Sequence, residues 1–135
     1  AWQAAMRIER AGKETKILHF GDHDPSGIDM TRDIEERFET FQVYNIEIER
    51  CALNIEQVRQ FNPPPSPAKI TDSRAKKYIQ EFGHDSWELD AMQPADLQAL
   101  AEERIREQID MGIWELTQQR EDVERQMISN LTNYL

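Results

Sequence analysis

A short apolar run, too short for a helix, leads directly into a cluster of turn-forming residues. Residues 17–20 (Ile-Leu-His-Phe) are typical of a buried strand, and residues 21–27 are dense in Gly, Asp, Pro and Ser. From Ile28 to Phe41 apolar residues recur every three or four positions, which predicts an amphipathic helix. Apolar and polar residues then alternate over residues 44–49, as in a half-exposed strand. This order favours an α/β fold with a mostly parallel sheet flanked by helices.

Further helices are predicted on both sides of this unit. Residues 1–11 form a helical pattern that ends before Gly12, and shorter helices are predicted over residues 55–61 and 75–82. The prolines within residues 63–67 predict a stiff connecting loop, residues 86–92 are expected to be extended, and another helix is predicted to begin at Pro94 and to include Ile109. An apolar stripe over residues 113–134 predicts a C-terminal amphipathic helix. We therefore expect an α/β domain over residues 1–111, and a helix over residues 112–135 that packs on that domain or on a partner.

Composition limits the class of protein. The 135 residues suit one domain, and no apolar run is long enough to cross a bilayer, so we expect no membrane partner. A single cysteine, Cys51, argues against a disulfide framework and favours a reducing, cytoplasmic compartment. The net charge of −10 argues against a nucleic-acid module held by net charge alone. Because the chain opens at Ala1 without a methionine or a signal peptide, we expect a fragment or a processed product.

The residues that carry chemistry follow the first predicted strand. Asp22 and Asp24 are two positions apart, so in an extended backbone both side chains project to the same side. They would lie beyond the carboxyl end of the strand, where open α/β sheets bind their ligands. Two carboxylates held close together repel each other unless a cation or a proton lies between them, and hard oxygen ligands suit Mg²⁺. The loop therefore predicts a divalent-cation site.

Three simpler interpretations compete with a cation site. The aspartates can form Asx turns in a surface loop, and for an isolated DxD sequence that interpretation would be favoured. Ser26 and Asp29 have the spacing of a capping box, so Asp29 is predicted to cap the helix and not to bind metal. Residues 22–33 partly match a calcium loop, but a strand precedes them, Pro25 interrupts them and Asp33 stands where Glu is expected.

The block from Gly21 to Met30 (GDHDPSGIDM) resembles the DxD motif of TOPRIM domains. It is close to the D-x-D-P-x-G form of the topoisomerase VI A subunit and of its relatives that make meiotic double-strand breaks. The order that follows is similar too: a helix, a strand that ends in Cys51-Ala52-Leu53, a Pro-rich loop, and an acidic segment (Trp87–Met92) before the helix at Pro94. The similarity extends over residues 16–110.

The resemblance implies a domain that binds Mg²⁺, or Mn²⁺ in its place, and acts on DNA phosphodiesters. In this family a Glu at the end of an earlier strand and the two Asp of DxD hold the metal, so Asp22 and Asp24 are the expected ligands. No strand precedes the helix over residues 1–11, so the family's first strand and its Glu are expected upstream of this chain. The nucleophilic tyrosine of the topoisomerases belongs to a separate winged-helix domain. The resemblance therefore implies that this chain is catalytically incomplete.

Other candidate residues have ordinary alternatives. Lys69 and Arg74 belong to the one locally basic stretch, and either contact phosphate or form a charged helix start. Glu88 and Asp90 alternate on the expected extended segment, and form either an outer acidic pair or a solvated face. His23 is expected to point away from the aspartates between which it lies. The remaining interpretations concern packing. Tyr44, Tyr78 and Tyr134 stand at periodic apolar positions and are predicted to be core, and Cys51 is predicted to be a small buried residue.

Three functions remain open at the level of sequence. The leading one is the metal-binding TOPRIM part of a larger DNA-processing protein of the topoisomerase or nuclease type. The second is a non-catalytic acidic domain that interacts with a partner, or with a second copy, through the C-terminal helix. Arg120 interrupts the apolar stripe of that helix, which argues against a long coiled coil. The third is a self-sufficient nuclease or phosphoesterase that takes its third carboxylate from Glu88 or Asp90.

Overall fold

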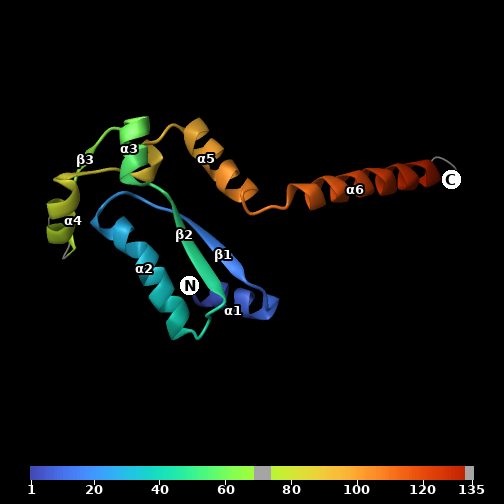
Figure 1. Cartoon of the computed structure of the whole chain (residues 1–135), viewed down its shortest axis with the longest axis horizontal. Coiled ribbons are helices and arrows are strands. Elements are labelled where there is room, and N and C mark those ends of the chain that lie inside the picture. Colours follow the sequence, from blue (N-terminus) through green and yellow to red (C-terminus); the bar gives the residue numbers. More distant parts are fainter. Residues whose placement is uncertain (69–73, 133–135) are drawn as a thin grey trace. The chain divides into compact units, whose positions relative to one another are not determined.

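The computed structural model describes residues 1–68 and 74–132 (Figure 1). The chain divides into two compact units, Ala1–Gln98 and Ala99–Leu135. The described residues form six α-helices, one short 3-10 helix and two two-stranded sheets, of which one is parallel. The α/β class predicted from the sequence is therefore confirmed. The predicted boundary at residue 112 lies inside the second unit and stays a prediction.

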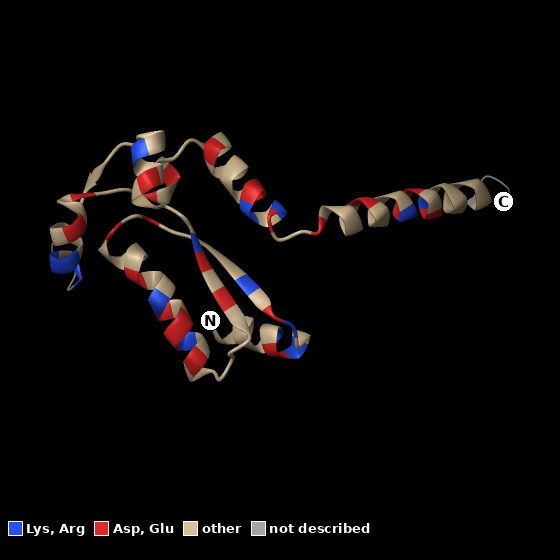
Figure 2. Ribbon diagram, viewed as in Figure 1, with Lys and Arg blue, Asp and Glu red and all other residues tan. Residues whose placement is uncertain are grey.

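A parallel β–α–β unit forms the centre of the first unit. Strand β1 (Thr15–Phe20) pairs in parallel with β2 (Ile46–Ala52), and α2 (Pro25–Thr40) connects them (Figure 1). The predicted strand–helix–strand order is confirmed, with β1 beginning two residues earlier than predicted and β2 extending to Ala52. Lys16 on β1 bonds to Glu47 and Glu49 on β2, and acidic and basic side chains alternate along α2 (Figure 2).

A small apolar core holds α1 (Trp2–Ala11) against this unit. Helix α1 ends at Gly12, whose φ of 60° is left-handed and suits glycine, as the sequence predicts. The buried residues at the centre of the core are Ala5, Phe38 and Val43. Partly buried neighbours from α1, α2 and both strands pack around them: Ala4, Ile8, Ile17, Ile34, Phe41 and Ile46. Removal of this apolar surface from water stabilises the first unit.

The rest of the first unit consists of short elements. Helix α3 (Ile55–Phe61) begins with a capping box between Asn54 and Gln57. The proline run is non-helical as predicted and contributes β3 (Ser66–Pro67), which pairs antiparallel with β4 (Asp85–Ser86). Helix α4 (Ala75–Phe82) lies between these strands in the sequence. The expected extended segment over residues 86–92 is only partly confirmed, because Leu89–Ala91 form a 3-10 helix, η1.

Two helices follow. Helix α5 (Pro94–Arg106) begins at the predicted proline but ends before Ile109, and α6 (Met111–Thr132) forms the predicted C-terminal helix. The side chain of Asp110 caps α6 by accepting a hydrogen bond of 3.1 Å from the backbone N–H of Ile113. Large apolar side chains along α6 are exposed, Leu116 and Leu131 each by 67%. No helix in the described part of the chain is both long and apolar enough to cross a membrane.

Candidate metal-binding loop

The acidic loop, residues 21–27, begins where both parallel strands end. The N–H of Gly21 donates to the carbonyl of Ala52 (2.8 Å), and the N–H of Leu53 donates back to the carbonyl of Gly21 (2.6 Å). These two bonds extend the pairing of β1 and β2 by one step into the loop. Asp22 therefore lies at the carboxyl end of the strand pair, as predicted, which is the edge where ligands bind in parallel α/β sheets.

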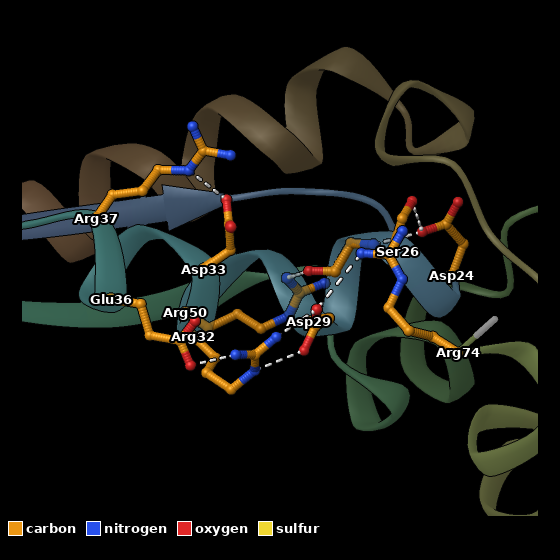
Figure 3. A network of polar contacts seen from close by, with 10 residues as sticks. Asp24, Ser26, Asp29, Arg32, Asp33, Glu36, Arg37, Arg50 and Arg74 are labelled. Atoms are coloured by element: carbon orange, nitrogen blue, oxygen red, sulfur yellow. Dashed lines mark hydrogen bonds and ion pairs between the residues drawn. The ribbon is translucent and has the colours of Figure 1, made fainter. Parts of the chain in front are cut away.

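Asp24 caps helix α2. Its Oδ1 accepts hydrogen bonds from the N–H of Gly27 (2.5 Å) and from the hydroxyl of Ser26 (3.0 Å; Figure 3). Pro25 is the first helical residue, where its missing N–H costs no hydrogen bond. The predicted capping box between Ser26 and Asp29 is therefore wrong, because the helix begins one residue before Ser26 and its cap is Asp24. A cap of this kind is typically worth about 1 kcal/mol.

Asp22 is held from the other side of the loop. Its Oδ1 accepts a hydrogen bond of 2.8 Å from the N–H of Leu89, at the start of η1. Asp22 and Asp24 thus each commit Oδ1 to a backbone amide, and neither Oδ2 has a hydrogen-bond partner among the described residues. Both residues are partly exposed. The loop therefore offers two oriented carboxylate oxygens, which are hard donors of the kind that Mg²⁺ prefers.

His23, between the two aspartates, is buried with an exposed fraction of 1%. Its backbone N–H and C=O pair with the C=O and N–H of Trp87 at 2.7 and 2.9 Å. Its ring packs edge-on against Tyr78, Phe82 and Trp87, with ring-centre distances between 4.7 and 5.7 Å. Burial lowers the pKa of His23, since the protonated ring would lose its hydration. The aromatic cluster therefore holds the middle of the loop with a neutral histidine.

The hydroxyl of Tyr78 completes this cluster. It lies 2.8 Å from His23 Nδ1, 2.8 Å from the carbonyl oxygen of His23 and 3.0 Å from that of Asp85. Because carbonyl oxygens only accept, the hydroxyl proton points to them and His23 Nδ1–H donates to the hydroxyl oxygen. Burial raises the pKa of Tyr78, so the phenol stays protonated. The prediction that Tyr78 is a core residue is confirmed.

Arg50, near the end of β2, lies half-buried under the loop. Its guanidinium donates to four backbone carbonyls, those of Gly21, Asp22, Gly27 and Leu53, at distances between 2.6 and 3.2 Å. Its Nε is buried and has no hydrogen-bond partner in the part of the chain that the structure describes. Burial lowers the pKa of Arg50, whereas the charges of Asp22 and Asp24 raise it. A half-buried cation, bonded among the described residues to neutral carbonyls, therefore lies close enough to the two carboxylates for their charges to act on it.

A groove of about 300 Å³ lies between α2 and α4, next to the loop. Pro25, Ile28, Tyr78 and Phe82 provide its apolar lining, and the charged lining residues are Asp29, Arg32, Arg74, Lys77 and Glu81. Asp29 forms a two-pronged pair with Arg32 at 2.8 and 2.9 Å, and a longer pair with Arg74 at 3.4 Å (Figure 3). These arginines hold the pKa of Asp29 below its ordinary value, with Arg32 the larger cause.

One of the two predicted phosphate contacts lines this groove. Arg74 stands at the entrance of α4 and lines the groove, so it is close to the acidic loop in space although 50 positions separate it from Asp24 in the sequence. Lys69, the other predicted contact, lies outside the described residues. Lys77 belongs to the same basic stretch of the sequence but was not a predicted phosphate contact, and it is an exposed cation of the same groove.

The weaker acidic candidates lie near the loop but do not complete a ligand set. Glu88 and Asp90 flank Leu89, whose N–H bonds Asp22, and both residues are exposed. The expected alternation of the two on a strand is wrong, because the chain turns into η1 after Glu88. Among the residues that the structure describes, no group of three or more His, Cys, Asp or Glu side chains is placed to hold a metal ion. Their role as ligands stays a prediction.

Of the remaining packing predictions, one is confirmed, one is wrong and one lies outside the described residues. Cys51 is buried, as predicted, with an exposed fraction of 2%. Tyr44 is 74% exposed, so its prediction as core is wrong: it precedes the first residue of β2, and its side chain has no face of a sheet to pack on. Tyr134 lies outside the described residues.

Two contributions to the loop were missed in the sequence. Arg50 was not identified, and Tyr78 was identified as a core residue but not as a hydrogen-bonding group. For Arg50 a signal exists, since a charged residue directly before the buried run Cys51-Ala52-Leu53 requires polar partners inside the fold. For Tyr78 the helical periodicity indicates burial but not a partner, which lies 55 positions away.

Comparisons of the chain with protein-family models, with curated proteins and with solved structures find no match. The likeness to TOPRIM domains therefore depends on the residues of the acidic loop and on the order of the elements that follow it.

Proposed function

We propose that the first unit is a TOPRIM-like domain that binds Mg²⁺ or Mn²⁺ at Asp22 and Asp24 and takes part in phosphodiester chemistry on DNA within a larger protein. One observation carries the proposal. The two carboxylates follow β1 at the edge where β1 and β2 both end, and each is oriented by a backbone amide while its second oxygen stays without a partner among the described residues.

The donor set suits a cation of this class. Mg²⁺ is commonly held by one or two carboxylates, with water and substrate phosphate as its other ligands. When bound, such a cation neutralises charge on a phosphate and orients the reacting oxygens. The contribution of this chain is to hold Asp22 and Asp24 in place, through the amides of Leu89 and Gly27 and through the buried His23 between them. A site preorganised in this way loses little entropy when the ligand binds.

We propose that DNA phosphates approach over the α2–α4 groove. Arg74 and Lys77 line it beside the start of α2, in a chain that is otherwise strongly acidic. Phosphate contacts from such side chains position a nucleic acid without reading its sequence. Replacement of Lys77 by Gln should weaken binding to duplex DNA of any sequence in the presence of Mg²⁺. An unchanged affinity, measured by fluorescence anisotropy at low salt, would place the DNA elsewhere.

Isothermal titration with Mg²⁺ and Mn²⁺ tests the metal site. Asp22→Asn and Asp24→Asn are the appropriate variants, because an amide oxygen still accepts the hydrogen bonds from Leu89 and Gly27 while the ligand charge is lost. Asp33→Asn is the matched control, since Asp33 is also a partly exposed aspartate and its one side-chain partner among the described residues is Arg37. We expect the double variant Asp22→Asn/Asp24→Asn to lose binding and the control to keep it. Equal binding by the double variant would refute the site.

The exposed apolar side chains of α6 favour a second candidate function, self-association. Ile113, Leu116, Val123 and Met127 follow one stripe of the helix, each at least 51% exposed. We propose that a second copy covers this stripe in antiparallel orientation, because parallel pairing would place Arg120 against Arg120. In an antiparallel pair centred on α6, Leu116 faces Met127 of the partner and the two arginines are offset.

Sedimentation velocity separates this candidate from a monomeric domain. Leu116→Glu introduces a charge into the stripe, and Gln118→Glu introduces the same charge on the opposite side of the helix. We expect the wild-type chain to dimerise, Leu116→Glu to be monomeric and Gln118→Glu to remain a dimer. A monomeric wild-type chain would exclude self-association through α6.

A further inference from the structure

The loop that carries the two aspartates brings two negative charges close together in the sequence. Asp22 and Asp24 are separated by one residue, and neither forms an ion pair with a lysine or arginine among the described residues. Uncompensated like charges of this kind destabilise the folded state. A cation held nearby would reduce this repulsion when no metal is bound.

Arg50 is the cation whose contacts fit that role. Its Nη1 donates to the carbonyl of Gly27 at 2.7 Å, at the far end of the loop. Its Nη2 lies 2.6 Å from the carbonyl of Asp22 and 3.2 Å from that of Gly21, at the near end. One guanidinium thus spans the loop from its first residue to its last, and Figure 3 shows Arg50 reaching toward the first turns of α2. Its planar fork fixes the direction of these carbonyls as a flexible ammonium group cannot.

The bonding of Arg50 also sets it apart from the arginines around it. Arg32 and Arg37 each bond a carboxylate on their own helix. Within residues 1–68 and 74–132, all four hydrogen bonds of the Arg50 guanidinium go to backbone carbonyls, and its buried Nε has no partner. Burial of a charge that is not directly paired is costly, and it is tolerated where nearby charges of opposite sign compensate it. Asp22 and Asp24 are the charges that act on it.

We propose that Arg50 is the positioning residue of the acidic loop, an internal cation that shapes the loop backbone and balances Asp22 and Asp24 while no metal is bound. The metal-related half of this inference rests on the proposed function. Because Arg50 already supplies positive charge, a divalent cation that binds the two carboxylates gains less electrostatic free energy. Arg50 therefore lowers the affinity of the loop for metal and stabilises the folded loop when no metal is bound.

The first test needs no metal. Arg50→Gln and Arg50→Lys are a matched pair, since both side chains are shorter and lose part of the fork, but only lysine keeps the charge. The midpoint of thermal unfolding is measured in EDTA for three proteins: the wild type, Arg50→Gln and Arg50→Lys. Each is then measured again with the two substitutions Asp22→Asn and Asp24→Asn added. We expect the two asparagines to leave the midpoint unchanged or lower in the wild type and in Arg50→Lys, and to raise it by several degrees in Arg50→Gln.

The sign of that change decides the proposal. If the two asparagines act alike in the wild type and in Arg50→Gln, Arg50 does not balance the aspartates and the proposal is overturned. If Arg50→Gln shows no cooperative unfolding transition, the triple variant Arg50→Gln/Asp22→Asn/Asp24→Asn decides. A cooperative transition in the triple variant supports the proposal, and its absence overturns the proposal. Arg59→Gln, an exposed arginine of α3, is the control and should show no coupling to the aspartates.

The second test adds Mg²⁺. We expect saturating Mg²⁺ to raise the midpoint of Arg50→Gln at least twice as far as that of the wild type or of Arg50→Lys, because the cation then replaces the missing charge. A smaller shift in Arg50→Gln than in the wild type would overturn the moderating role. If Mg²⁺ shifts neither the wild type nor Arg50→Gln, the proposed metal function fails, while the measurements in EDTA still judge the balancing role of Arg50.

Discussion

Replacement of Tyr78 by Phe removes one buried hydroxyl from the cluster that holds His23. The carbonyl of His23 keeps its hydrogen bond from Trp87, and Asp85 is exposed, so its carbonyl can bond to water. The group left without a partner is His23 Nδ1–H, on a side chain that is 1% exposed. A buried polar group left unsatisfied costs about 1–3 kcal/mol, so we expect the free energy of unfolding to fall by about 2 kcal/mol.

Tyr44→Phe is the matched control, because it removes the same hydroxyl from a side chain that is 74% exposed. Its effect should stay within about 0.5 kcal/mol. Urea unfolding measures both variants, followed by the fluorescence of Trp87 after Trp2 and Trp114 have been replaced by Phe. Equal stabilities of Tyr78→Phe and Tyr44→Phe would refute the hydrogen-bond network around His23. A neutral His23 with its proton on Nδ1, observed by nitrogen NMR, would support it independently.

Three further predictions concern the same loop. Gly27→Ala should destabilise the first unit by about 1–3 kcal/mol in urea unfolding, because a Cβ there would collide with the carbonyl oxygen of Asp22; wild-type stability would show that the turn is looser than described. Asp24→Ala should cost about 1 kcal/mol through loss of the α2 cap, whereas Asp24→Asn should be close to neutral, and equal losses would argue against capping. The lowered pKa of His23 means that the unfolded chain binds a proton more readily than the folded one, so stability should be fully present above the ordinary pKa of 6.5 and fall as the pH drops below it. Burial also lowers the pKa of His19, so both histidines contribute to the pH dependence of the free energy of unfolding. Measured by urea unfolding between pH 7 and pH 5, this dependence should decrease more in His23→Gln than in His19→Gln. The reverse order would contradict the burial argument.

The elements around the loop could be predicted because their signals are local. The apolar run before Gly21, the turn formers after it and the helical spacing from Ile28 each involve neighbours in the sequence. The errors have local causes too. The choice of Ser26 over Asp24 as the cap moved the predicted helix start by two residues. The alternation that includes Tyr44 began the predicted strand before Ile46, where β2 begins.

The candidate site could be predicted only as two aspartates at a strand end. Neither the bond from Leu89 to Asp22 nor that between Tyr78 and His23 has a sequence signal, because 67 and 55 positions separate the partners. Arg50 has a local signal, because it directly precedes the buried run Cys51-Ala52-Leu53, but the four carbonyls to which it donates become evident only in the folded loop.

The sequence by itself determined the order of strand, acidic loop and helix, since periodicity and turn chemistry depend on residues close together in the chain. Only the tertiary structure decided which oxygens of Asp22 and Asp24 are already bonded, that His23 is buried and that a half-buried guanidinium bonds the loop backbone. The physical reason is that hydrogen bonding and desolvation depend on which groups packing brings together, and these come from segments far apart in the sequence.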